Sequence, residues 1–94
     1  MLVIRNIFVA KPGQASKLAA QLKEMAGVMP EMKGRVFTDL TGGFNRVILE
    51  HEVENLTAFE ARMKDYGTNP AVREKMKGYT DLYVTGEREI LQSA

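Results

Sequence analysis

The hydrophobic positions in the first third of the chain change from the spacing of a strand to that of a helix. Residues 2–10 are largely apolar and β-branched, which predicts a buried strand, and Pro12 with Gly13 interrupts the run. After this turn, apolar side chains recur every three or four residues, which predicts an amphipathic helix that ends near Gly27 and Pro30. Its apolar stripe is Ala15, Leu18, Ala19, Leu22, Met25, Ala26 and Met29.

The middle of the chain predicts a hairpin whose register follows from its charges. Residues 35–41 and 44–53 are the two expected strands, and Gly42 with Gly43 supplies the positive φ angles of a two-residue turn. Counting outward from this turn, opposite charges meet twice with an apolar pair between them, a match that a one-residue slip would lose. The expected pairs are Arg35 with Glu50, Phe37 with Ile48, and Asp39 with Arg46.

The two faces of this hairpin have different character. Side chains on a strand alternate between faces, so the residues between the pairs point to the other side. These residues are Val36, Thr38, Leu40, Val47, Leu49 and His51. Because they are mainly apolar, we expect them to pack on the helices and the charge-paired set to face away.

Two helices and a last strand complete the expected order. Asn55 and Asn69 are suitable N-caps, because their side-chain oxygens can accept a free backbone N–H, and Pro70 suits the first turn of the shorter helix. Residues 80–91 are expected to form the last strand. The order strand, helix, strand, strand, helix, strand predicts a ferredoxin-like βαββαβ sandwich of the α+β class with an antiparallel sheet. We expect residues 1–94 to be a single domain of this kind.

The only histidine, His51, lies between Glu50 and Glu52, which raises the question of a metal site. Strand alternation places both glutamates on one side and the imidazole on the other, so the three cannot hold one ion. With no second histidine and no cysteine, the sequence predicts no metal site. We expect His51 to be a hydrogen-bonded structural residue facing the helices; a ligand-pocket residue and a general base are the alternatives.

Charge and hydropathy exclude two classes of partner. The formal net charge is +1 and the charged residues are spread along the chain, whereas nucleic-acid binding needs a clustered basic face. No apolar run approaches the ~20 residues of a membrane-spanning helix. We therefore expect no nucleic-acid partner, no membrane contact and a cytoplasmic location.

A sheet with helices on one face leaves its other face uncovered. In a chain of 94 residues, association with a second copy is a reasonable way to cover it. We expect a homodimer in which two sheets stack and bury Phe37 and Ile48, with Arg35 and Arg46 at the interface and neutralised by their acidic neighbours. The alternative is a solvated sheet face.

Three further polar side chains are candidates for a ligand pocket. Asn6 is an amide in a central strand and needs hydrogen-bond partners, in a structural role or as an anchor in an apolar pocket. Tyr66, near the end of the second helix, and Tyr83, on the last strand, are either core aromatics or pocket residues. The methionines on or near the helices either fill gaps or line an adaptable pocket.

Several segments together resemble a known superfamily. They are "VAKPGQASKLAAQL" after the first strand, the Gly-Gly hairpin, "ENLTAFEARM" after the third strand, and the terminal "GEREIL". Over its whole length the chain resembles the dimeric α/β-barrel superfamily, which includes antibiotic-biosynthesis monooxygenases and NIPSNAP-like proteins. The resemblance implies a homodimer with a closed or near-closed barrel and a cavity in each protomer between sheet and helices.

The same resemblance bears on the chemistry. Heme-degrading members use a first-strand asparagine, a tryptophan and a helix histidine; Asn6 matches the first, the chain has no tryptophan, and "NPAVREKMKGY" has no histidine. We therefore expect no cofactor. Two functions remain open. One is a non-catalytic module that binds a small hydrophobic molecule. The other is a cofactor-independent monooxygenase or isomerase in which Asn6, His51 and one tyrosine orient the substrate.

Overall fold

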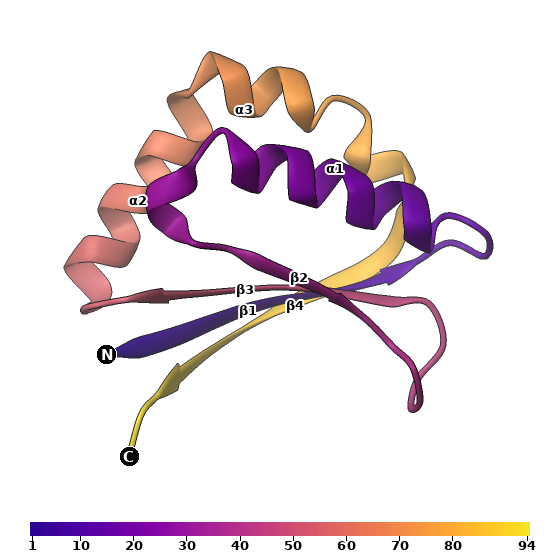
Figure 1. Ribbon diagram of the computed structural model, residues 1–94, viewed down its shortest axis with the longest axis horizontal. Coiled ribbons are helices and arrows are strands. Elements are labelled where there is room, and N and C mark those ends of the chain that lie inside the picture. Colours follow the sequence, from indigo (N-terminus) through magenta and orange to yellow (C-terminus); the bar gives the residue numbers. More distant parts are fainter.

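The computed structural model describes all 94 residues and places every helix on one face of a four-stranded antiparallel sheet (Figure 1). The strands lie in the order β2-β3-β1-β4, so that the first strand is central and the chain ends on an edge strand. This is the ferredoxin-like α+β fold predicted from the sequence. The elements are β1 (Leu2–Ala10), α1 (Ala15–Gly27), β2 (Arg35–Thr38), β3 (Arg46–Val53), α2 (Leu56–Thr68), α3 (Pro70–Lys75) and β4 (Tyr83–Gln92), with 3-10 turns at Pro30–Met32 and Tyr79–Asp81.

The helices begin where the sequence predicts. Asn55 Oδ1 accepts the backbone N–H of Ala58 at 2.9 Å, and Asn69 Oδ1 accepts that of Ala71 at 2.9 Å. These bonds satisfy amides that have no partner within the helix, and they confirm both predicted N-caps.

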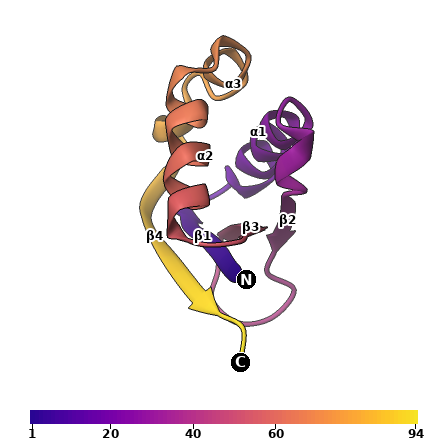
Figure 2. The same cartoon turned by 90° about the vertical axis from the view of Figure 1, so that its left-hand side faces the viewer.

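The predicted stripe of α1 and of the turn after it contributes four residues to the core. Leu18, Leu22, Met25 and Met29 are at most 1% exposed and pack against the sheet and α3. The apolar stripe predicted for α2 behaves differently, because none of its residues is buried. This stripe is Leu56, Phe59, Met63 and Tyr66. Figure 2 shows α1 and α2 side by side above the sheet with α3 beyond them.

The hairpin has the predicted register but not the predicted turn. Arg35 pairs with Glu50 and Phe37 with Ile48. However, β2 ends at Thr38 and β3 begins at Arg46, so residues 39–45 form a wider loop that projects from the sheet in Figure 1. The prediction of a two-residue turn is therefore wrong.

The loop conformation explains this difference. The positive φ angles fall at Gly42 (107°) and Asn45 (63°), which are not adjacent as a tight hairpin turn requires. The carbonyl of Asn45 accepts the backbone N–H of Ala10 at 2.7 Å, which ties this end of the loop to β1. Leu40, expected to face the helices, is instead 98% exposed in the loop.

Pairing between strands divides the sheet into the two faces that the sequence predicts. Val47, Leu49 and His51 of β3 are buried beneath the helices, whereas Glu50 and Glu52 point to the other side. The outer face carries the two predicted charge pairs. Arg46 Nε donates to Asp39 Oδ2 at 3.0 Å, and Arg35 donates to the Glu50 carboxylate. No helix covers this outer face (Figure 1).

Candidate functional site

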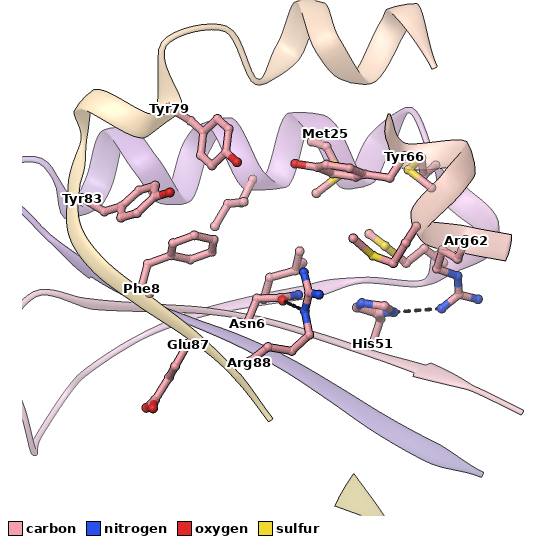
Figure 3. A pocket seen from close by; sticks show the side chains of 16 residues that line it. Asn6, Phe8, Met25, His51, Arg62, Tyr66, Tyr79, Tyr83, Glu87 and Arg88 are labelled. Carbon is pink, nitrogen blue, oxygen red and sulfur yellow. Dashed lines mark hydrogen bonds between the residues drawn. The ribbon is translucent and has the colours of Figure 1, made fainter. Parts of the chain in front are cut away.

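A cavity of about 460 Å³ lies between the helices and the inner face of the sheet. This volume falls within the range of about 300–1,000 Å³ that is usual for small-molecule sites. Most of the lining is apolar or aromatic, with a small polar set at the sheet (Figure 3). The hydrophobic lining residues are Phe8, Leu22, Met25, Met29, Met32, Leu49, Met63, Tyr66, Tyr79 and Tyr83.

The sheet supplies the polar floor of this cavity. Asn6 of β1 is the Cα partner of Leu49 on one side and of Arg88 on the other, so the three side chains share the inner face. His51 lies two residues beyond Leu49 on β3 and therefore points the same way. Figure 3 shows Asn6, Arg88 and His51 grouped beneath the methionines and tyrosines of the helical side.

His51 is held by an arginine of α2. It is 5% exposed, and Arg62 Nη1 lies 2.8 Å from its Nδ1 and also donates to the carbonyl of Glu52 at 2.8 Å. A guanidinium can only donate, so Nδ1 must accept and the neutral ring carries its proton on Nε2. Burial, followed by the positive charges of Arg62 and Arg88, lowers the pKa of His51 to about 4. The imidazole is therefore neutral at pH 7.

Asn6 has the partner that its position in a central strand requires. Arg88 Nε donates to Asn6 Oδ1 at 2.7 Å. The guanidinium carbon of Arg88 also lies 5.4 Å from the centre of the Phe59 ring, in cation–π range. The side chain of Arg88 is thus fixed from β1 on one side and from α2 on the other.

Aromatic side chains close the cavity near its other end. The rings of Phe8 and Tyr83 are 5.1 Å apart, and those of Tyr79 and Tyr83 are 5.8 Å apart. Burial, then the neighbouring Tyr79, raises the pKa of Tyr66 to about 12, so this hydroxyl keeps its proton at neutral pH.

The structure brings all four sequence-predicted ligand candidates to one cavity. Asn6, His51, Tyr66 and Tyr83 come from four different elements and all line it. His51 has the structural hydrogen bond expected of it and faces the cavity as well. Four of the methionines assigned to gap filling or pocket lining line the cavity, namely Met25, Met29, Met32 and Met63. The first three also belong to the core cluster, as does Met76.

The lining residues that sequence reasoning missed include Arg62, Tyr79 and Arg88. Arg62 had a usable signal, because it lies in the middle of α2, three residues after Phe59 of the apolar stripe. Arg88 had none in the local sequence, since its partner Asn6 is 82 residues away. The predicted interface residues Arg35, Phe37, Arg46 and Ile48 lie away from the cavity, on the outer face.

The structure shows no group of three or more acidic, histidine or cysteine side chains that could hold a metal ion. The residues also do not fit a heme ligand. The short helix α3 and the turn after it carry no histidine, and the Nδ1 atom of His51 is bonded to Arg62. No helix is long and apolar enough to cross a membrane.

Solved structures share this fold, whereas no protein family defined by sequence and no curated protein matches the chain. An uncharacterized NIPSNAP domain protein from Burkholderia xenovorans is 16% identical with a TM-score of 0.84, over 100% of this chain and 95% of that one. A NIPSNAP-like domain protein from the same organism is 22% identical with a TM-score of 0.81, over 99% and 84% of the two chains. A putative antibiotic biosynthesis monooxygenase from Chloroflexus aurantiacus is 19% identical with a TM-score of 0.74, over 99% and 93%.

The buried neutral histidine makes the stability of the protein depend on pH. The folded-state pKa is lowered from 6.5 to about 4, so the unfolded chain binds more protons between these values. We expect His51 to contribute fully above pH 6.5 and its contribution to be lost as the pH falls toward 4, by about 1–3 kcal/mol. Urea unfolding of the wild type and His51→Gln at pH 7.5, 6, 5 and 4 measures this contribution. An equal decline in both proteins would contradict it.

The resemblance inferred from the sequence is confirmed at the level of the fold: the chain folds like NIPSNAP-domain proteins and antibiotic biosynthesis monooxygenases.

Proposed function

We propose that this protein is a homodimer that binds a small, largely hydrophobic molecule between its sheet and its helices. The observation that carries the proposal is the cavity itself, which is apolar along its walls and has a few fixed polar groups at its floor. Small-molecule sites have this composition, because apolar walls supply affinity and sparse polar groups set orientation.

The polar groups are fixed before any ligand arrives. Asn6 is bonded to Arg88 and His51 to Arg62, so neither side chain has to be ordered on binding. The methionines on the opposite wall are flexible and polarizable, which suits a ligand of irregular shape. A cavity collapsed onto methionine and leucine would have argued against this function.

The outer face of the sheet supports a second copy as its cover. Phe37 is 43% exposed there and Leu91 41%, with Ile7 and Ile48 between the charged rows. One row across the sheet alternates in sign, as Arg35, Glu50, Arg5 and Glu89. Hydrogen bonds from Arg5 and Arg35 lower the pKa of Glu50, so its charge is already compensated within the protomer.

This charge pattern favours a copy of the same chain over another partner. A face whose charges are already paired can be covered with little electrostatic penalty, and a twofold axis brings the same apolar centre of each sheet together. Arg35 also lies over the ring of Phe37, 5.4 Å from its centre, which holds that ring on the face.

A cofactor-independent monooxygenase or isomerase is the second candidate function. The presence of both Asn6 and His51 in one cavity favours it, because both can donate to an oxygen of a bound substrate. It is also supported by the fold shared with a putative antibiotic biosynthesis monooxygenase. The cytoplasmic location remains a prediction from the sequence.

A screen of small molecules by thermal shift tests the binding function. We expect ligands that raise the melting temperature of the wild type; at a concentration of 100 Kd the stabilisation is about 2.7 kcal/mol. Asn6→Ala should lose most of this shift, because it removes the polar anchor. Gln92→Ala, which removes an exposed amide outside the cavity, should retain it. A ligand whose effect is unchanged in Asn6→Ala would remove Asn6 from the site.

Replacing the central phenylalanine of the outer face tests the dimer. We expect the wild type to run at twice the protomer mass in light scattering. Phe37→Asp should be a folded monomer, because a dimer of this variant would bury two charged carboxylates, one from each protomer. Phe44→Asp is the matched control, since Phe44 is 90% exposed in the 39–45 loop. A monomeric wild type, or a Phe37→Asp protein that remains a dimer, would refute the sheet-to-sheet interface.

Oxygen consumption tests the second candidate function. A polycyclic phenol mixed with the protein in an oxygen electrode should consume oxygen faster than the phenol alone, without added metal or flavin. Because donors to the substrate oxygen act in the transition state, we expect Asn6→Ala to slow the reaction by about 10- to 1,000-fold. If the wild type gives only the background rate with every substrate that binds, the enzymatic candidate fails and the binding function stands.

A further inference from the structure

We propose that the floor of the cavity is a carboxylate-binding site, and that the ligand is an amphipathic acid with an apolar body. The proposal rests on the proposed binding function, because it assigns the chemistry of the molecule that the same cavity holds. Each of the fixed polar groups at the floor presents a hydrogen-bond donor. The one acidic residue that borders the cavity, Glu87, directs its side chain away from it (Figure 3).

The first donor is the Nε2–H group of His51. Arg62 occupies Nδ1 and cannot accept a hydrogen bond, so the proton of the neutral ring must lie on Nε2. His51 is therefore a donor toward the cavity and not a base. Its low pKa agrees with this arrangement, since burial and then the neighbouring positive charges disfavour the protonated ring.

The second donor is the amide of Asn6. The atom that faces Arg88 Nε at 2.7 Å must be the oxygen, because an amide nitrogen and a guanidinium cannot bond to each other. This contact fixes the orientation of the amide and leaves its NH₂ group for a ligand. A carboxylate oxygen can accept from this group, whereas an ammonium or a hydroxyl used only as a donor cannot.

The third element is the positive charge of Arg88 itself. Asn6 is its only hydrogen-bond partner, and a neutral amide does not compensate a guanidinium. The acidic neighbours of Arg88 along β4 are directed to the outer face. Glu89 lies 4.0 Å from Arg5 there, and Figure 3 shows Glu87 pointing away from the cavity.

A carboxylate satisfies these groups better than a neutral or cationic head. Charge-assisted hydrogen bonds are roughly twice as strong as neutral ones, and a guanidinium can bind a carboxylate through two parallel bonds. The apolar body would then lie along Met25 of α1 and the methionines that follow this helix, and against the aromatic cluster of Phe8, Tyr79 and Tyr83.

Calorimetry with three probes of one chain length tests the proposal on the full-length protein at pH 7.5. We expect decanoate to bind at least about 10-fold more tightly than decanol, and decylamine to bind more weakly than either. Arg88→Gln should reduce the affinity for decanoate to about that for decanol. Arg88→Lys keeps the positive charge but not the planar guanidinium that forms two parallel hydrogen bonds. It should therefore recover part of the preference for decanoate over decanol.

An arginine outside the cavity provides the matched control. Arg73 is exposed on α3 and does not line this cavity, so Arg73→Gln should leave the preference for decanoate unchanged. A circular-dichroism melt of each variant checks that it is folded. Asn6→Ala is a second test of the carboxylate site, because it removes the amide donor.

The outcomes separate this proposal from the binding function. Equal affinity for decanoate and decanol, or an unchanged preference in Arg88→Gln, would overturn the carboxylate site while the cavity still binds a ligand. If the thermal-shift screen finds only neutral ligands and none of the three probes binds, the carboxylate proposal fails alone. If neither the screen nor the probes give any ligand, both proposals fail.

Discussion

The register of β1 with its two neighbouring strands determines the chemistry of both faces of the sheet. Because β1 pairs antiparallel with β3 and β4, Asn6 lies beside Leu49 and Arg88, while Arg5 lies beside Glu50 and Glu89. A slip of one residue would exchange the two sets between the faces and leave charged groups under the helices. The cavity and the outer face are thus two consequences of the same pairing.

This pairing separates the charges of the two faces. The acidic residues of β3 and β4 lie on the outer face, where arginines such as Arg5 and Arg35 compensate them. The inner face receives Arg88, and α2 adds Arg62 beside His51. A cavity built in this way stabilises negative charge on an oxygen, and its histidine, held as a donor by Arg62, is not placed to remove a proton. A substrate that is already anionic, such as a phenolate, therefore suits the enzymatic candidate better than a neutral one.

The sequence predicts well the features that depend on residues close together in the chain. It predicts poorly the features that depend on contacts between distant segments. The register of Arg35 with Glu50 follows from local charge complementarity, and the positions of the helices follow from periodicity and caps. The prediction of a two-residue turn at Gly42 is wrong because the loop is tied to another strand, by the hydrogen bond from the backbone N–H of Ala10 to the carbonyl of Asn45. The sequence predicts that Asn6 needs a partner but does not identify Arg88, since the pairing of β1 with β4 joins residues far apart in sequence. Asn6 and His51 are therefore predictable as polar residues of the site, whereas the place of Arg88 follows only from the three-dimensional structure.

The cavity also explains why α2 contributes so little to the core. Its N-cap and its apolar stripe are those of a well-packed helix, yet none of its residues is buried, and Leu56 is 57% exposed. Where α1 meets apolar side chains of the sheet, Met63 and Tyr66 of α2 meet the cavity, so apolar area on this helix remains uncovered. Each Å² that a ligand removes from water contributes about 25 cal/mol. A bound molecule would thus cover the apolar side of α2, as β3 helps to cover that of α1. The packing of α2 should therefore improve as the occupancy of the site rises.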